Sequence, residues 1–529
     1  MHSNQQTSVE KSLIPAHINS LADYIEETFQ KYAQRPCYNA LGQTKTFAEM
    51  DNLSARFANY LLSHTNLKPG DRIAIQLPNL IQHPIAVYGA LRAGLVVVNT
   101  NPLYTPTEMQ HQFNDSGTSA LVILTDLLPK YESIADSVTI DTVIVTSASQ
   151  LLDNKPLGLL KYPCYADIFT KVPNAQSISR APTTLDDACI LQYTGGTTGV
   201  SKGAELSHLN VLANSIQTLD RLGKTLVDAQ ELVVCPLPLY HIYAFTVCMM
   251  TFFAKGAMVL LIPNPRDING FVDTLKAHKF TAFAGINTLF MGLCQHPEFA
   301  KLDFSKLHLT MSGGTALTSS AADLWKNTTG CSVTEGYGLS ETAPVLAFNI
   351  PGEEVIGTVG LPLKHTDIQL LDINDRPVAD GEEGQIAAKG PQVMRGYWQR
   401  DDETAKVMTA NGYFKTGDVG VRLPNGCIKI VDRLKDMIIV SGFNVYPNEI
   451  EDVLCRHPKV LEAAVVGKPD DHSQERVCAY ITVTEAVNNS ELSAHCREFL
   501  TGYKIPKEFN IIDELPKSTV GKILRRQLR

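Results

Sequence analysis

Apolar and polar positions along the first half of the chain alternate between helical and strand-like patterns. The clearest helix is predicted over residues 46–63, where Thr46 and Glu49 have the spacing of a capping box. Apolar residues recur there at helical intervals, at Phe47, Met50, Leu53, Phe57 and Leu61. A second helix is predicted from "SHLNVLANSIQTL", residues 207–219.

Short apolar runs rich in β-forming residues lie between the helical patterns. These runs are residues 72–79, 119–125, 141–147, 188–194, 231–238, 257–263, 307–312 and 332–338. Strand-like runs that alternate with helices are typical of βα units, in which helices cover a sheet of parallel strands. The pattern therefore predicts an α/β fold with mostly parallel sheets.

The pattern changes after about residue 360. There "DINDRP", "ADGEEG" and "LPNGC" separate short strand-like runs, which predicts a small β-rich subdomain with tight turns. From residue 432 onward, helical and strand-like runs recur within a segment the size of a small domain. We place the boundary between Leu434 and Lys435. It divides the chain into a large N-terminal domain (1–434) and a small α+β C-terminal domain (435–529).

Size and composition are typical of a soluble globular protein with at least two domains. The chain has 529 residues, of which 44% are hydrophobic and 19% are charged, and this length exceeds that of one ordinary core. The net charge of −9 argues against broad nucleic-acid binding, which needs clustered basic surface. Eleven scattered cysteines without a C-x-x-C pair favour free thiols in a reducing cytosol.

No targeting or membrane-spanning segment is expected. The N-terminal stretch "MHSNQQTSVEKSL" is polar and lacks the apolar core of a signal peptide. The most apolar stretch, residues 251–263, is short and is interrupted by Lys255. We therefore expect a cytoplasmic protein, whose only contact with a membrane would be peripheral.

The stretch "YTGGTTGVSKG", residues 193–203, has two competing interpretations. Its last five residues have the G-x-S-x-G pattern of a serine hydrolase, with Ser201 as the nucleophile. However, Ser201 lies seven residues beyond the predicted strand, and no oxyanion-hole segment of the H-G-G-G kind precedes it. A flexible linker is disfavoured, because a buried-looking strand precedes the stretch and a helix follows it. The hydrolase remains the alternative from another enzyme class.

A phosphate-binding loop accounts for more of these residues. Glycines bring backbone N–H groups close to an anion, hydroxyls add donors, and lysine adds a positive charge. The Walker pattern does not fit, because Val200 or Ser201 stands where its second glycine belongs. The candidate phosphate-binding residues are Thr194, Gly195, Gly196, Thr197, Thr198, Gly199, Ser201, Lys202 and Gly203.

The longer stretch "YTGGTTGVSKGAELSH" resembles the phosphate-loop signature of the acyl-adenylate-forming enzymes. That superfamily contains acyl-CoA synthetases, peptide-synthetase adenylation domains and luciferases. Six further signatures follow in the family's order: "PLPLYHIYAF", "SGGTAL", "EGYGLSET", "YFKTGD", "DRLKDMIIVSGFNVYPNEIE" and "PKSTVGKILRR". Four stretches are most similar to bacterial long-chain fatty acid–CoA ligases: "QYTGGTTG", "NPRDI", "KGPQVMRGYWQR" and "SGFNVYPNEIEDV".

The resemblance implies an ATP- and Mg²⁺-dependent ligase that converts a fatty acid to acyl-AMP and transfers it to coenzyme A. Alternatives are a ligase for a medium-chain, aryl or other carboxylic acid, or an enzyme that transfers its acyl group to a carrier protein. The resemblance also implies a mobile C-terminal domain and a homodimer. Since the substrate arrives through a bilayer, peripheral contact with the inner face of the membrane is a further expectation.

By resemblance, the nucleotide site extends well beyond the phosphate loop. Tyr337 would lie against the adenine, Asp418 would accept both ribose hydroxyls, and Glu341 would bind Mg²⁺. Ser340 stands where the family usually has threonine, so the hydroxyl is kept. The remaining nucleotide-site residues implied are Gly313, Gly314, Thr315, Glu335, Gly336, Gly338, Ile430, Arg433 and Lys522.

The resemblance also assigns catalytic and acyl-site roles. Lys522 would stabilise the charges that meet at the α-phosphate, together with Thr194 and Glu341, and His241 would orient the acyl carboxylate. The acyl tunnel would include His241, Phe245, Gly285 and Asn287. The C-terminal domain would rotate about Lys435 and bring Ser441, Gly442 and Phe443 to the thioester step.

Overall fold

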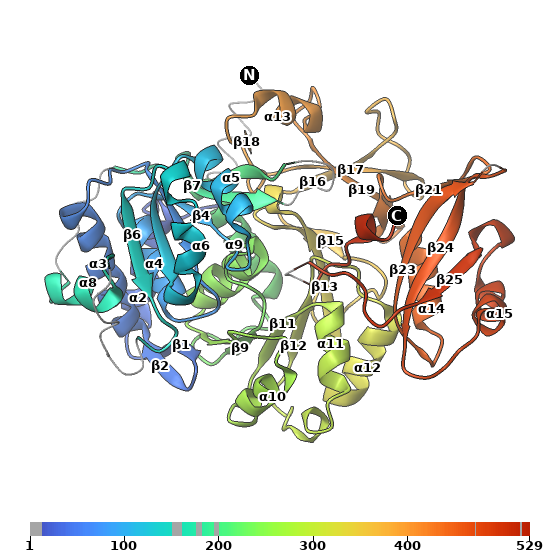
Figure 1. Ribbon diagram of the computed structural model, residues 1–529, viewed down its shortest axis with the longest axis horizontal. Helices are drawn as coiled ribbons and strands as arrows, with labels where there is room; N and C mark the ends of the chain where they lie inside the picture. Colours follow the sequence, from blue (N-terminus) through green and yellow to red (C-terminus); the bar gives the residue numbers. More distant parts are fainter. Residues whose placement is uncertain (1–12, 151–160, 176–181, 195–199, 471, 519–520) are drawn as a thin grey trace.

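The chain folds into two large sheets with their helices, a small β-rich subdomain and a C-terminal domain at one end of the long axis (Figure 1). The computed structural model describes residues 13–150, 161–175, 182–194, 200–470, 472–518 and 521–529. The first sheet uses strands between residues 72 and 207 together with residues 396–397, and the second uses residues 36–46 together with strands between residues 232 and 362. This arrangement confirms the predicted α/β class.

In the described part of the chain, the first sheet has seven strands, and its central strands are parallel. Their order across the sheet is β18 (Gly396–Tyr397), β8 (Lys202–Ser207), β7 (Ala188–Thr194), β4 (Val96–Asn99), β3 (Arg72–Gln76), β5 (Thr118–Leu124) and β6 (Thr142–Thr146). β7 and β8 form an antiparallel hairpin, and β18 pairs with the outer side of β8. β8 was not predicted, because a helix was expected directly after the loop.

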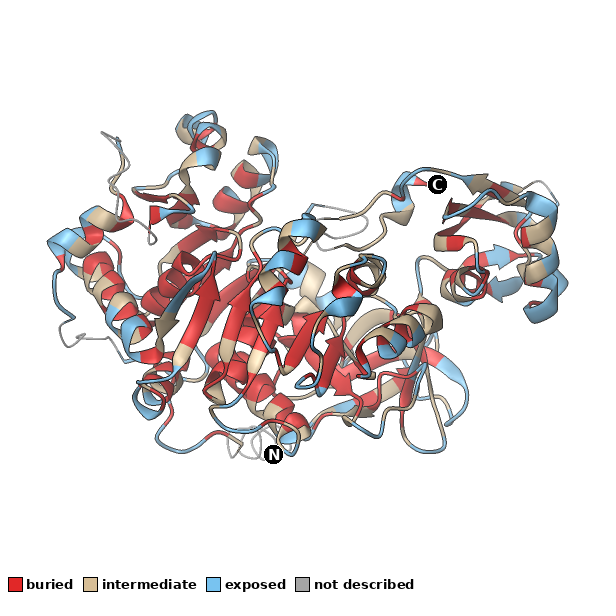
Figure 2. Ribbon diagram, turned by 90° about the horizontal axis from the view of Figure 1, so that it is seen from below, coloured by how far each residue is buried: buried red, intermediate tan, exposed pale blue. Residues whose placement is uncertain are grey.

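The second sheet has nine strands among the described residues, and its central pairs are also parallel. Their order is β15 (Leu361–Pro362), β14 (Val345–Phe348), β13 (Val333–Gly338), β12 (Leu309–Ser312), β11 (Ala282–Gly285), β9 (Leu232–Cys235), β10 (Met258–Leu261), β1 (Pro36–Ala40) and β2 (Gln43–Thr46). The strands predicted in residues 231–338 are therefore confirmed. Figure 2 shows that the strands of both sheets are mostly buried.

Helices cover the faces of these sheets. They are α2 (Leu21–Lys31), α3 (Phe47–His64), α4 (Gln82–Arg92), α5 (Pro106–Ser116), α6 (Leu128–Glu132), α8 (Tyr165–Lys171), α9 (His208–Leu222), α10 (Ile268–Lys276), α11 (Asn287–Cys294) and α12 (Ser319–Thr329). In α3 the predicted capping box is present: Thr46 Oγ1 accepts from the Glu49 N–H, and the Glu49 carboxylate accepts from the Thr46 N–H. Phe47, Met50 and Phe57 are buried on one face of this helix, as predicted.

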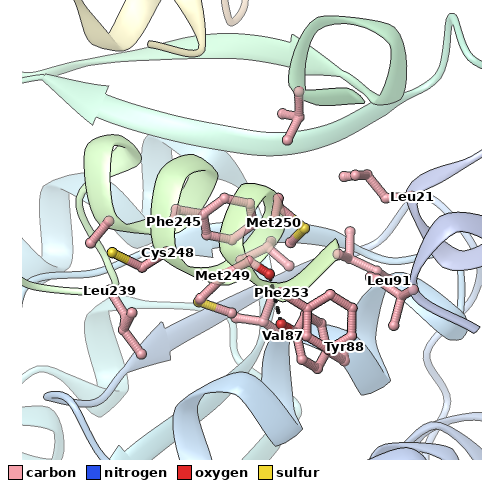
Figure 3. Close-up of a cluster of buried hydrophobic side chains, with 14 of the residues drawn as sticks. Leu21, Val87, Tyr88, Leu91, Leu239, Phe245, Cys248, Met249, Met250 and Phe253 are labelled. Carbon is pink, nitrogen blue, oxygen red and sulfur yellow. Dashed lines mark hydrogen bonds between the residues drawn. The ribbon is translucent and has the colours of Figure 1, made fainter. Parts of the chain in front are cut away.

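The largest hydrophobic core joins the two sheets. The π-helix η3 (Ala244–Phe252) runs through it, and every residue of this helix is buried (Figure 3). Phe253, which follows η3, packs against Tyr88 with ring centroids 5.1 Å apart. Within the described part of the chain, no helix has both the length and the apolar character needed to traverse a bilayer.

The β-rich subdomain is an antiparallel sheet, as predicted for the segment after residue 360. Its strands are β16 (Asp367–Leu371), β17 (Glu383–Lys389), β19 (Phe414–Arg422) and β20 (Ile428–Arg433), and α13 (Asp401–Val407) lies between β18 and β19 in the sequence. Asp418 of β19 pairs with Arg433 of β20. This register places two candidate nucleotide-site residues opposite each other.

The C-terminal segment has a core of its own, extending from Ile438 to Phe509. Its sheet contains β21 (Ile438–Val440), β22 (Phe443–Val445), β23 (Val460–Asp470), β24 (Gln474–Val483) and β25 (Glu508–Ile511), and its helices are α14 (Pro447–Cys455) and α15 (Asn489–Phe499). The α+β character is as predicted. The boundary between Leu434 and Lys435 stays a prediction.

Candidate active site

A cleft of about 2880 Å³ lies where the two large sheets, the β-rich subdomain and the C-terminal segment meet. Most of the candidate residues line it. They are Thr194, Ser201, Lys202, His241, Asn287, Gly314, Thr315, Glu335, Gly336, Tyr337, Gly338, Ser340, Glu341, Asp418, Ile430, Arg433, Lys435 and Lys522. The cleft therefore collects residues from seven separate sequence signatures.

The candidate phosphate loop connects the two strands of the β7–β8 hairpin. Thr194 pairs with Lys202 across it, and Ser201 Oγ donates to the Thr194 carbonyl at 2.8 Å. Gly195, Gly196, Thr197, Thr198 and Gly199 lie outside the described residues. A nucleophile elbow needs a strand-to-helix turn, whereas Ser201 precedes a strand. The geometry therefore contradicts the hydrolase alternative.

Lys202 is held at the mouth of the hairpin by two partners from the segment around β18. Its ammonium forms an ion pair with Glu403 of α13 and lies 5.0 Å from the centroid of the Tyr397 ring. Gly203 follows on β8, and its carbonyl accepts from the Trp398 N–H at 2.8 Å. The sequence analysis identified neither Tyr397 nor Glu403 as a site residue.

Glu341 lies in the short 3-10 helix η5 (Ser340–Thr342), and only 8% of the residue is exposed. The Tyr397 hydroxyl donates to Glu341 Oε1 at 2.9 Å, and the Met394 N–H donates to the Glu341 carbonyl at 2.8 Å. Carboxylate oxygen is a ligand that Mg²⁺ prefers. A carboxylate fixed at the cleft in this way fits the predicted metal ligand.

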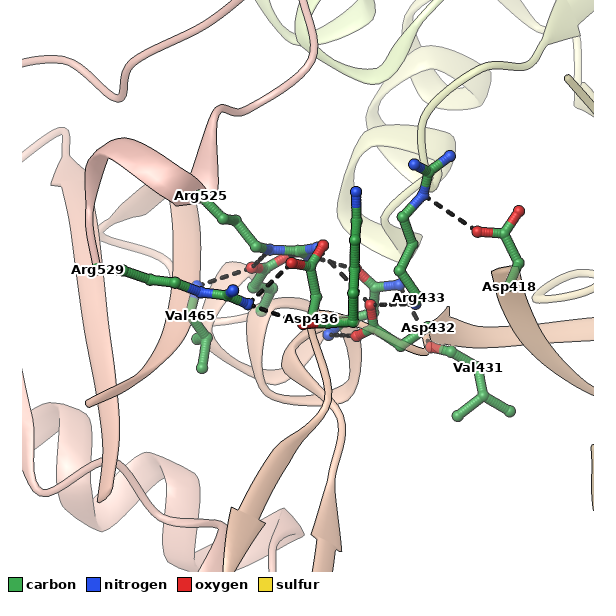
Figure 4. Close-up of polar contacts among 11 residues, drawn as sticks. Asp418, Val431, Asp432, Arg433, Asp436, Val465, Arg525 and Arg529 are labelled. Carbon is green, nitrogen blue, oxygen red and sulfur yellow. Dashed lines mark hydrogen bonds and ion pairs between the residues drawn. The ribbon is translucent and has the colours of Figure 1, made fainter. Parts of the chain in front are cut away.

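Asp418 is 4% exposed and has a separate partner for each carboxylate oxygen. The Tyr337 hydroxyl donates to Oδ2 at 2.7 Å, and Arg433 Nε lies 3.1 Å from Oδ1 (Figure 4 shows the Arg433 contact). Burial raises the pKa of Tyr337 well above its usual value, so the phenol stays protonated and can donate. The arrangement orients a bidentate acceptor toward the cleft.

Packing requires glycine at two positions beside Tyr337 and leaves little room at a third. A Cβ on Gly338 would overlap the Pro344 carbonyl, and one on Gly336 would overlap the Phe348 ring. A Cβ on Gly313 would lie 3.3 Å from the Gly336 carbonyl. These contacts hold β13 against β14 and keep this wall of the cleft thin.

Glu335 and Thr315 place further polar groups in the same region. Glu335 Oε1 accepts from the Leu317 N–H at 3.3 Å, and burial raises the pKa of this carboxyl to about 8. Glu335 therefore keeps its proton at neutral pH and has a hydroxyl to donate. The Thr315 hydroxyl is buried without a partner among the described residues.

The loop that carries Lys522 is seated in the cleft. The Ser518 N–H donates to the Lys522 carbonyl at 2.7 Å, and the Lys522 N–H donates to Ser518 Oγ at 3.1 Å. A Cβ on Gly314 would lie 3.9 Å from Lys522 Cε, and one on Gly521 would lie 2.5 Å from Ile286 Cδ1. The loop is thus fitted between two segments of the N-terminal part.

The charge of Lys522 influences the ionisation of His241. Burial lowers the pKa of Lys522 to about 8, with a smaller contribution from Arg433, while Asp418 and Glu341 act in the opposite direction. Burial lowers the pKa of His241 to about 3, and the positive charge of Lys522 contributes. His241 is therefore a neutral imidazole at physiological pH.

The candidate tunnel residues are not all brought to the cleft. Phe245 is 0% exposed in η3, and Gly285 ends β11, where a Cβ would lie 2.6 Å from the Phe290 ring (Figure 3 shows Phe245). Asn287 starts α11, and its Oδ1 accepts from the Thr318 N–H at 2.9 Å. The stretch 284–290 therefore runs from the end of β11 into the first turn of α11, and its role as a tunnel wall stays a prediction.

The residues expected at the thioester step do not line the cleft in this arrangement. Ser441 and Gly442 form the turn between β21 and β22, with φ of 51° and 83°. Phe443 is 57% exposed and stacks on Tyr503, with ring centroids 4.9 Å apart. A role for them in catalysis requires a different position of the C-terminal domain.

Arg525 forms an ion cluster across the segment that contains Lys435 (Figure 4). Its guanidinium lies 2.6 Å from Glu451 of α14, 3.5 Å from Asp436 and 3.7 Å from Asp432 of β20. Arg529 adds a contact of 2.9 Å to Asp436. The cluster links the β-rich subdomain, the predicted hinge and the C-terminal domain, and the sequence analysis did not predict it.

Comparisons with known proteins agree with this geometry. A family model described as AMP-binding enzyme matches residues 25–398, and one described as AMP-binding enzyme C-terminal domain matches residues 449–522. The long-chain-fatty-acid–CoA ligase of Escherichia coli O157:H7 is 43% identical over 539 residues, with 98% of this chain and 96% of the relative covered.

Two further comparisons extend this result: one relative is named for a different acid, and the other has a solved structure. The feruloyl-CoA synthase of an Amycolatopsis species is 33% identical over 492 residues, with 92% of this chain and 94% of the relative covered. The crystal structure of ATP-bound MatB from Rhodopseudomonas palustris has a TM-score of 0.85 at 27% identity, with 97% of this chain and 98% of that chain covered.

Proposed function

We infer the reaction of this protein from the family to which the chain belongs, the AMP-binding enzymes: it is an AMP-forming acid–thiol ligase. A fatty acid and ATP give acyl-AMP and pyrophosphate, and coenzyme A then displaces AMP to give acyl-CoA. Adenylation is required because a free carboxylate has a poor leaving group.

One observation carries the proposal: the cation of Lys522 shares a cleft with the carboxylates of Asp418 and Glu341. Lys522 comes from the C-terminal segment, and the two acids come from β19 and η5. Such a set of groups suits a nucleotide whose ribose lies at one acid and whose phosphates lie between the other acid and the lysine.

The nucleotide would be held at three points. Tyr337 and the thin glycine wall receive the adenine, the Asp418 carboxylate accepts the ribose hydroxyls, and the loop of residues 194–203 donates to the β- and γ-phosphates. Lys202 adds its charge there when the phosphates replace Glu403 as its anionic partner.

Glu341 would hold Mg²⁺, because its carboxylate is an oxygen ligand fixed at the edge of the cleft. The bound ion would neutralise charge on the phosphates. The chain then contributes Lys522, whose ammonium stabilises the negative charge that develops where the fatty carboxylate meets the α-phosphate. No general base is needed, since that carboxylate is already ionised at neutral pH.

Neutral His241 would orient the fatty carboxylate through a hydrogen bond, without adding a second positive charge beside Lys522. Phe245 would have to move for an acyl chain to pass, since it is buried in the core. We propose a long-chain substrate, on the basis of the 43% identity to a long-chain-fatty-acid–CoA ligase. An aryl acid is the second candidate, since a feruloyl-CoA synthase is 33% identical.

ATP–pyrophosphate exchange tests the proposal. Exchange that depends on palmitate, followed by CoA-dependent thioester formation, is the expected result. Dependence on octanoate or ferulate in preference to palmitate would move the substrate to the medium-chain or aryl class. Exchange without thioester formation from CoA would favour transfer to a carrier protein, and absence of exchange with every acid would refute the adenylation reaction.

Three finer expectations belong to the same proposal. The C-terminal domain rotates about Lys435 after adenylation and brings Gly442 to the path of the pantetheine thiol. The protein is a homodimer, which light scattering measures. It also contacts the inner face of the membrane peripherally, which flotation with liposomes measures.

A further inference from the structure

The segment from Met394 to Trp398 connects the candidate phosphate loop to the candidate metal ligand. At one end the Met394 N–H donates to the Glu341 carbonyl at 2.8 Å, and at the other the Trp398 N–H donates to the Gly203 carbonyl at 2.8 Å. Between these bonds, β18 pairs with β8, so that Tyr397 is opposite Ala204. The segment therefore fixes η5 relative to the hairpin that carries Lys202.

The side chain of Tyr397 lies between the two charged groups that this segment connects. Its hydroxyl donates to Glu341 Oε1 at 2.9 Å, and its ring lies 5.0 Å from the ammonium of Lys202. This hydrogen bond fixes one of the two carboxylate oxygens of Glu341.

The backbone of Tyr397 also positions the counter-ion of Lys202. The Tyr397 N–H donates to Thr404 Oγ1 at 2.9 Å, which anchors the middle of α13. Glu403, the ion-pair partner of Lys202, lies in that helix. One residue thus contacts or anchors three charged side chains at the phosphate end of the cleft.

We propose that Tyr397 is a positioning residue that holds the Glu341 carboxylate and the Lys202 ammonium at the separation required to receive magnesium-bound triphosphate. The proposal rests on the proposed function, because it assumes that Glu341 binds the metal and Lys202 the phosphates. The hydroxyl of Tyr397 serves the metal ligand, and its ring supports the lysine through a cation–π contact.

The two parts of the side chain can be tested separately. Tyr397→Phe keeps the ring and removes the hydroxyl, whereas Tyr397→Leu removes both. The matched control is Tyr32→Phe, because the Tyr32 hydroxyl also donates to a carboxylate, that of Asp228, at 3.1 Å outside the cleft. Thermal unfolding of each variant checks that it is folded.

Binding of a non-hydrolysable ATP analogue is measured by calorimetry without fatty acid, first in EDTA and then at stepped Mg²⁺ concentrations. Mg²⁺ should enhance binding of the analogue. For Tyr397→Phe we expect the Mg²⁺ concentration that gives half of this enhancement to rise about tenfold, because a hydrogen bond to a charged group is lost. Its affinity in EDTA should stay within about twofold of the wild-type value, since the ring still supports Lys202. Tyr397→Leu should lose affinity in EDTA as well.

Two results would overturn the proposal: an unchanged Mg²⁺ dependence in Tyr397→Phe, or equal losses with and without Mg²⁺, which would indicate a purely structural role. A wild-type protein that does not bind the analogue at all would instead refute the proposed function. The two failures are therefore distinguishable.

Discussion

Tyr337 donates a hydrogen bond to Asp418 at 2.7 Å, although the two residues are 81 positions apart in the sequence. The contact joins β13 of the second large sheet to β19 of the β-rich subdomain. It orients the acceptor expected for the ribose before any nucleotide arrives. The residues proposed to bind the adenine and the ribose are therefore coupled through one hydrogen bond.

Asp418→Asn should raise the KM for ATP by roughly tenfold to a hundredfold, because an amide cannot accept on both sides and loses the charge that pairs with Arg433. ATP–pyrophosphate exchange at varied ATP concentration measures this. Asp367→Asn is the control, since Asp367 accepts from Tyr413 outside the cleft. An unchanged KM for ATP in the Asp418 variant would show that Asp418 does not contribute to nucleotide binding.

Lys522→Ala should lower the adenylation rate by roughly a hundredfold or more, since a charge aimed at the developing negative charge is lost. Thioester formation from preformed acyl-AMP should be spared, because Lys522 acts in the first half-reaction only. The two half-reactions are assayed separately by pyrophosphate release and by CoA consumption. Equal losses in both would contradict the assignment.

The pH dependence of adenylation should report the ionisation of Lys522. Burial lowers its pKa to about 8, so the ammonium is present below this value and is lost as the pH rises through it. We expect kcat/KM for adenylation to fall above about pH 8, and Lys522→Arg to move that fall to higher pH. A fall at the same pH in the arginine variant would assign it to another group.

Gly521→Ala should weaken adenylation by about tenfold while leaving transfer from acyl-AMP intact. Gly521 has φ of +76°, and an added Cβ would lie 2.5 Å from Ile286 Cδ1 and 3.1 Å from Thr288 Oγ1, so these side chains would have to shift for the loop to seat Lys522. Gly330→Ala, at φ of +77° with nothing near its Cβ, controls for backbone strain alone. A similar effect in both variants would argue against the close fit as the cause.

Lys435→Pro should impair thioester formation more than adenylation, because proline restricts the backbone rotation that the domain movement requires. Single-turnover assays of the two half-reactions measure the difference. A proportional loss in both would indicate that residue 435 is not the hinge.

The elements of the fold that local patterns specify were predictable. The cap of α3 depends on Thr46 and Glu49, three residues apart, and the buried strands of both sheets are continuous apolar runs. β8 was missed because "KGAELS" contains few β-branched residues and becomes a strand only by pairing with β7 and β18. The strand could be identified only once its pairing with neighbouring strands was known.

The site residues that belong to recognisable motifs were predicted. The site residues that are defined by contacts between distant segments of the chain were not. Tyr397 meets Glu341 across 56 positions, and Glu403 meets Lys202 across 201. Tyr397 lies in the stretch "KGPQVMRGYWQR", which carries only a family likeness, and Glu403 lies three residues beyond that stretch. The periodicity and spacing of residues cannot predict contacts between residues so far apart in the sequence.

The ion cluster of Arg525 makes the free energy of the proposed domain rotation depend on electrostatic interactions. Arg525 and Glu451 both follow Lys435 and would move together, whereas Asp432 precedes it and is 1% exposed. Rotation would therefore separate Arg525 from a buried carboxylate, which is unfavourable in surroundings of low dielectric constant. Salt screens a buried pair of charges much less than an exposed pair. The Arg525–Asp432 contact would therefore resist the proposed rotation over a wide range of ionic strength.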